Sequence, residues 1–140
     1  MKVLGFNFSK ISVEKFPNTG KKEDLKLNTN IDISDIRPVK ADMLKTKEEL
    51  MGIKFSYNIK YDPDYAKIEF SGDILLSIDP KLAKDVFKEW KDKKYPEDFQ
   101  LFVYNVILRK SNIKALELED EMNLPLHFPL PSLKKSESKQ

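Results

Sequence analysis

The sequence predicts an α+β domain in which a four-stranded antiparallel sheet is followed by two C-terminal helices packed on one of its faces. Apolar and polar residues alternate with period two through most of residues 4–78, whereas apolar residues recur every three or four positions between residues 80 and 118. A run of strands followed by a run of helices is typical of α+β folds with an antiparallel sheet. The last apolar stretch, residues 123–133, contains three prolines and is therefore expected to be an extended strip.

Four segments have the alternation of strands. The second to fourth strands are expected at residues 25–33, 53–61 and 66–78. The first strand, near the N-terminus, changes its apolar phase between Phe8 and Ile11, which predicts a bulge or a bend. Because the polar positions of the later strands would form a solvated face, the helices are expected on the opposite face.

Three connections join these strands. Residues 16–24 form a short charged crossover, and residues 37–50 form a longer connection that is expected to contain one helical turn. The third and fourth strands are expected to form a hairpin around the proline-containing turn at residues 62–65.

The two helices have distinct start signals. Asp79 is a good N-cap, and Pro80 suits the first helical position. Pro96 can open the second helix, which is expected to run to about residue 118. That helix has one apolar stripe that faces the sheet and a second stripe displaced around the helix. We expect the second stripe to form an interface with another copy of the chain, in a dimer or tetramer. The alternative is that the first helix or the C-terminal strip covers it. The second stripe is Leu101, Tyr104 and Leu108.

Composition excludes several classes of protein. With 140 residues, one domain is expected over residues 1–133, followed by a disordered charged tail at residues 134–140. The net charge of +2 argues against a dedicated nucleic-acid binder. The chain has no cysteine, no apolar run near the roughly 20 residues of a membrane span, and no signal-like start. A cytoplasmic protein is therefore expected, with no membrane partner.

The sequence offers little for catalysis. His127 is the only histidine, and there is neither a Cys–His pair nor a phosphate-binding glycine motif. We expect His127 to be structural or exposed, and the acidic run at residues 117–121 to be solvated. The sequence therefore predicts no enzyme, no cofactor and no metal site.

What remains is an excess of apolar residues at the two ends of the chain. Apolar surface beyond what a domain can bury is typical of binding sites for other chains. We therefore predict a polypeptide-binding surface from these two groups, although ordinary self-packing can explain at least half of them. The predicted residues are Phe6, Phe8, Ile11, Val13 and Phe16 in the first group, and Leu124, Leu126, Phe128 and Leu130 in the second.

Several segments resemble the SecB protein-export chaperones. The stretch FSKISVEKFPN resembles the family's opening strand, LKLNTNID resembles its second strand, and LFVYNVILRK resembles the start of its long helix. MNLPLHFPLPSL resembles the family's leucine- and proline-rich ending. These segments occur in the family's order over residues 4–133.

The resemblance implies a non-catalytic, ATP-independent holdase that assembles as a dimer of dimers and binds unfolded polypeptides in apolar grooves. Typical members are strongly acidic, which helps them dock on the SecA motor, whereas this chain is slightly basic. Docking to a SecA-type motor is therefore doubtful. A divergent member fits better. It would come from an organism without this motor, such as an archaeon, or would serve a dedicated client, such as an antitoxin. The rival hypothesis is a non-catalytic subunit that docks one fixed protein partner through its apolar strip.

Overall fold

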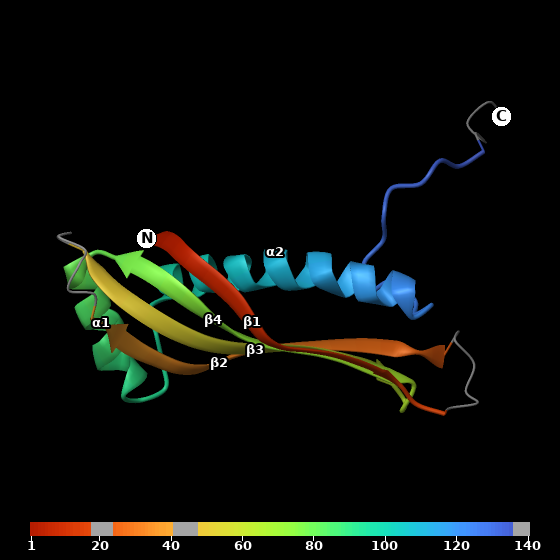
Figure 1. Ribbon diagram of the computed structural model, residues 1–140, viewed down its shortest axis with the longest axis horizontal. Helices are drawn as coiled ribbons and strands as arrows, with labels where there is room; N and C mark the ends of the chain where they lie inside the picture. The colour runs from red at the N-terminus through yellow and green to blue at the C-terminus, as the bar shows by residue number, and fades with distance from the viewer. Residues whose placement is uncertain (18–23, 41–47, 136–140) are drawn as a thin grey trace.

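The computed structural model describes residues 1–17, 24–40 and 48–135, which form four strands followed by two helices (Figure 1). The strands are β1 (Lys2–Lys15), β2 (Lys26–Val39), β3 (Glu49–Asp62) and β4 (Ala66–Ile78), and the helices are α1 (Pro80–Trp90) and α2 (Glu97–Glu121). The strands pair in the order β1-β4-β3-β2, and every pair is antiparallel. The predicted α+β class is confirmed.

The alternation of β3 and β4 sets the two faces of the sheet. The core side chains of the two strands lie opposite one another on one face, and both helices bury their apolar residues in the same core cluster. The other face carries polar side chains such as Lys54 and Asp73, which are paired across the two strands. The expected hairpin joins β3 to β4 directly.

β1 contains the predicted phase change. Its pairing with β4 shifts register between Val3 and Gly5 and again between Phe8 and Lys10, so Leu4 and Ser9 are extra residues in bulges. Each bulge reverses the side on which the following residues lie. The bulges therefore turn residues of both phases toward the helices, opposite core residues of β4. This row, called the β1 row below, consists of Val3, Phe6, Phe8, Ile11 and Val13.

β2 is longer than expected. The alternation ends at Ile33 because a bulge between Ile33 and Asp35 shifts the phase, but pairing with β3 continues to Val39. Pro38 is tolerated because β2 is an edge strand. The predicted connection at residues 37–50 is thus wrong at both ends, and most of its expected helical turn lies outside the described residues.

Both helices begin where their sequence signals indicate. The Asp79 side chain accepts hydrogen bonds from the backbone N–H groups of Lys81 and Leu82, and Pro80 is the first residue of α1. α2 begins after Pro96 and ends at Glu121, about one turn beyond the expected end. Within the described ranges, neither helix has the length and apolar character needed to cross a membrane.

The chain after α2 is extended, as the prolines predict. Residues 124–135, called the C-terminal strip below, contain no helix, and Figure 1 shows the end of the strip leading away from the sheet. The expected disordered tail, residues 134–140, and the crossover at residues 16–24 lie largely outside the described residues.

Gly72 lies where β1 and the core approach each other closely. A Cβ atom at this position would lie 2.3 Å from the backbone oxygen of Asn7 and 2.7 Å from Cζ of Phe55. The missing side chain therefore gives the Phe55 ring its place beside the β1 row. At Gly5 a Cβ would meet only Cβ of Leu75, at an ordinary contact distance of 3.7 Å.

We expect Gly72→Ala to lower the free energy of unfolding by about 1–3 kcal/mol, because the added methyl group overpacks the site. Gly5→Ala is the matched control on the neighbouring strand and should change stability by less than about 0.5 kcal/mol, as surface substitutions usually do. Urea denaturation measures both. Equal effects of the two substitutions would show that the Gly72 contact does not constrain the sheet.

Candidate functional site

The β1 row is only partly covered by the rest of the chain. Ile11 is 43% exposed, and the bulge residue Leu4 is also 43% exposed. Phe6, Phe8 and Val13 are half-buried. The apolar side chains of this edge strand point to the helical side of the sheet, and they remain partly exposed to solvent.

The inner sides of the aromatic rings are fixed by core contacts. Phe6 packs edge-to-face on Phe8 with ring centroids 5.0 Å apart, and their rings lie 5.3 Å from those of Phe55 and Phe70, respectively. Lys110 on α2 places its Nζ 6.0 Å from the centroid of Phe6. The exposed parts of these rings thus belong to a preformed surface, which lowers the entropy that a ligand must offset.

Phe16 lies beyond the end of β1 and is half-buried. Its backbone N–H donates to the carbonyl of Tyr65 at 2.9 Å, so the chain stays attached to the β3–β4 hairpin at this end. Phe16 also lines a pocket of about 340 Å³ with Lys60, Lys67 and Glu69, which belong to the sheet face away from the helices. The first predicted group therefore follows one sheet edge, but Phe16 lies apart from the β1 row, beside the polar face.

The second predicted group divides into an anchor and an exposed part. Leu124 is 5% exposed and belongs to the core, so it is not accessible to another chain. Leu126, Phe128 and Leu130 are 37%, 50% and 52% exposed. Asn123 adopts a left-handed backbone conformation (φ 54°) that ends α2, and Leu124 N–H donates to the carbonyl of Glu119 at 2.8 Å. The strip thus starts from a fixed point.

A buried polar cluster holds the strip against α2 and β3. The Glu119 side chain is fully buried and accepts from the backbone N–H of His127 at 3.2 Å, while His127 Nδ1 lies 2.8 Å from Glu119 Oε1. On the other side of the ring, His127 Nε2 lies 3.0 Å from Asn112 Oδ1. We call this arrangement the Glu119–His127 clasp. It gives His127 the structural role that was one of its two expected roles.

Two tyrosines of β3 complete the clasp. The Tyr61 hydroxyl is in contact with Glu119 and lies 2.7 Å from the carbonyl of Pro125, and the Tyr57 hydroxyl donates to Asn112 Oδ1 at 2.8 Å. Burial raises the pKa of Tyr61, and its hydrogen bond to Glu119 and the negative charge of that residue raise the pKa further. Burial and the Glu119 charge also raise the pKa of Tyr57. Both phenols therefore stay protonated and can act as donors.

The clasp was not predicted, and the acidic run at residues 117–121 is not uniformly solvated as expected. Glu119 is buried because it continues a row at four-residue spacing that packs on the sheet. This regular spacing was the signal in the sequence that could have singled out Glu119. The buried row is Phe99, Val103, Ile107, Ser111, Ala115 and Glu119.

The two predicted groups are not joined directly. Within the described ranges, no hydrogen bond or ring contact links the β1 row to the C-terminal strip. The strip is attached instead to α2 and β3 through the clasp. The structure thus shows two apolar surfaces on the described part of the chain, one along β1 and one on the strip.

The second stripe of α2 is unevenly covered. Leu101 is 55% exposed, whereas Tyr104 and Leu108 are half-buried. The Tyr104 hydroxyl lies 2.8 Å from that of Tyr95, which precedes α2, so part of the stripe is covered from within the chain. Ile113, further along α2, is 61% exposed.

Comparison with known proteins shows a SecB-like fold. A structure of the Mycobacterium tuberculosis SecB-like chaperone Rv1957, in complex with a ChAD peptide from the Rv1956 HigA1 antitoxin, matches with a TM-score of 0.54. The match covers 96% of this chain and 91% of that chain at 10% sequence identity. No protein-family model and no curated protein matches this chain significantly.

We expect Glu119→Gln to release the C-terminal strip, because the charged acceptor of the clasp is lost. The free energy of unfolding should fall by about 1–3 kcal/mol, the usual cost of leaving a buried hydrogen-bonding group without its partner. Hydrogen exchange of the backbone amide of His127 should also become faster. Glu121→Gln is the matched control, because Glu121 is exposed at the end of the same helix. If both variants exchange like the wild type at His127, the clasp does not hold the strip.

Proposed function

We propose that the protein is a cytoplasmic, ATP-independent holdase chaperone that binds unfolded polypeptides. The observation that carries this proposal is the apolar surface left exposed at both ends of a well-packed chain. Ile11 in the β1 row and Phe128 and Leu130 in the C-terminal strip are each between 43% and 52% exposed. Large apolar side chains that cluster on a surface are typical of protein–protein interaction sites.

Burial of a client's apolar side chains would supply the binding free energy. Each Å² of apolar area removed from water contributes about 25 cal/mol, and the ordering of the client offsets much of this gain. Several weak contacts along one chain are therefore needed, which favours long unfolded clients over short peptides. The proposed contact residues are Phe6, Phe8, Ile11 and Val13 in the β1 row with Phe16 beyond its end at the same sheet edge, and Leu126, Phe128 and Leu130 on the strip, while Leu124 anchors the second surface.

The position of β1 also suits an extended client. β1 is an edge strand that pairs with β4 on one side, and no strand of the described residues pairs with its other side. An extended polypeptide can add to such an edge by backbone hydrogen bonds, which do not depend on its sequence. The neighbouring apolar row would then receive side chains of the added segment.

The structural comparison supports a role with polypeptides, because the matched chaperone was solved with a bound peptide. We do not include docking to a SecA-type motor in the proposal. The sheet face away from the helices carries Lys54, Lys60 and Lys67, and the net charge is +2, whereas docking in the family uses acidic surface.

A second candidate function is a non-catalytic subunit that docks one fixed protein partner. The clasp favours this alternative for the strip, since a strip held in one conformation suits a single partner. The two functions differ in breadth. A holdase should suppress the aggregation of several unrelated denatured proteins, whereas a subunit should act on none of them.

We expect the double substitution Phe128→Asp and Leu130→Asp to reduce aggregation suppression at least about threefold, because two charges replace apolar contact surface. The matched control is Ser132→Asp with Lys134→Gln, which changes the charge of the same strip by the same amount and should retain wild-type suppression. Light scattering of three unrelated denatured proteins without nucleotide gives the measurement. Circular dichroism should show an intact sheet in both variants.

If the wild type suppresses aggregation of none of the three proteins, the holdase proposal is wrong. Suppression that both double variants retain would exclude the strip from the binding surface.

We also propose that the chain assembles as a dimer or tetramer through the outer side of α2, around Leu101, Tyr104 and Leu108. Light scattering of the pure protein should give two or four times the chain mass of 16.4 kDa. Leu101→Asp should lower this mass because it places a charge in the apolar contact, while Ser132→Asp should leave it unchanged. A wild-type mass of 16.4 kDa would contradict the assembly.

A further inference from the structure

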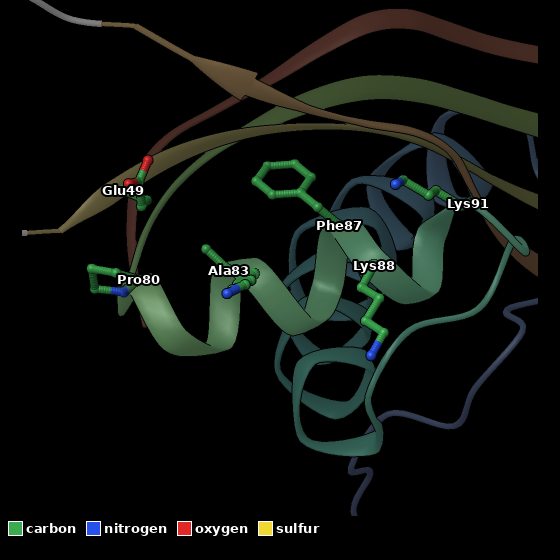
Figure 2. A pocket seen from close by; sticks show the side chains of 7 residues that line it. Glu49, Pro80, Ala83, Phe87, Lys88 and Lys91 are labelled. Atoms are coloured by element: carbon green, nitrogen blue, oxygen red, sulfur yellow. The ribbon is translucent and has the colours of Figure 1, made fainter.

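A second site lies at the other side of the sheet from β1, beside α1. A cleft of about 770 Å³ opens between α1 and the start of β3. Pro80, Ala83 and Phe87 give it an apolar lining, and Figure 2 shows Phe87 projecting from α1 toward the strands. α1 packs on β2 and β3, whereas β1 is at the opposite edge. The cleft is thus separate from the proposed client-binding surface.

Most of the charges around the cleft are positive. Lys84, Lys88 and Lys91 line it at spacings of four and three residues, and all three side chains are exposed. Glu49 is the one acidic residue in the lining. Among the described residues, none of the three lysines forms an ion pair.

Helix stability explains this arrangement only in part. Lys88 and Lys91 lie at the end of α1, where positive charge interacts favourably with the helix dipole. Lys84 lies in the middle of the helix, and its position four residues before Lys88 places two like charges side by side, which is unfavourable. A negatively charged ligand at the cleft would relieve this repulsion.

We propose that the cleft binds an acidic polypeptide segment that carries at least one bulky apolar side chain. The apolar lining around Phe87 would receive the apolar side chain, and the three lysines would pair with carboxylates on either side of it. A phosphate ion would leave the apolar lining unused. This site would dock a partner with a defined charge pattern, independently of whether the β1 surface holds unfolded clients.

The test uses fluorescence anisotropy with three labelled 14-residue peptides. The first contains glutamates and two phenylalanines, the second has glutamine in place of each glutamate, and the third has serine in place of each phenylalanine. The first should bind at least about tenfold more tightly than the other two, a difference of about 1.4 kcal/mol. Raising the salt concentration should weaken its binding, because the lysines are exposed.

The variant Lys84→Glu with Lys91→Glu should weaken binding of the first peptide at least about tenfold. The matched control is Lys81→Glu with Lys94→Glu, which makes the same charge change on exposed residues outside the cleft lining and should stay within twofold of the wild type. Lys84→Gln with Lys91→Gln provides a milder variant if the charge reversal unfolds α1, and circular dichroism checks this.

Three results of the binding experiments would overturn the proposal. The peptides could bind equally, the control variant could lose as much affinity as the cleft variant, or a single-stranded oligonucleotide could displace the acidic peptide more effectively than unlabelled peptide does. A lower mass of the pure protein for the cleft variant alone would instead assign the cleft to a second copy of the chain, which also contradicts the proposal.

Discussion

The four-stranded sheet is wider than a single helix that packs on it. Four strands at a spacing of about 4.8 Å span about 14 Å between the outer strand axes, whereas a helix with its side chains is about 10–12 Å across. The one long helix, α2, packs on β3, and the short helix α1 packs on β2 and β3. α2 reaches the β1 row at Phe6 through Lys110, but Ile11 remains 43% exposed although the two bulges turn the apolar residues of β1 toward the helical side. Exposed apolar surface is thus a direct consequence of the topology.

The Glu119–His127 clasp gives the second apolar surface a defined position. Ordering an extended strip without secondary structure costs about 1–2 kcal/mol of conformational entropy per residue. The clasp offsets part of this cost because it joins the strip to α2 and β3 through charge-assisted and buried hydrogen bonds. Leu126 lies within the clasped segment and is 37% exposed, whereas Phe128 and Leu130 follow the clasp with half of their surface exposed.

Local patterns were enough to predict most of the fold. The period-two alternation predicted the four strands, and the Asp79–Pro80 pair predicted the start of α1. The phase change in β1 predicted its second bulge. The end of β2 could not be predicted, because the bulge after Ile33 interrupts the alternation while long-range pairing with β3 continues.

The clasp and the cleft depend on contacts that a single sequence does not reveal. Glu119 and His127 are eight residues apart, but Asn112, Tyr57 and Tyr61 reach them only through tertiary packing. The cleft beside α1 likewise requires the position of that helix on the sheet. The burial of Leu124 was missed for the same reason, since the predicted strip had no known partner in the core.

Hydrogen exchange of the wild-type protein, with and without a permanently unfolded client such as a reduced and alkylated protein, would show whether the two apolar surfaces bind other chains. We expect protection of backbone amides in β1 and in residues 126–130 when the client is present. Protection that is confined to α1, or that occurs nowhere, would contradict the claim that these two apolar surfaces serve other chains.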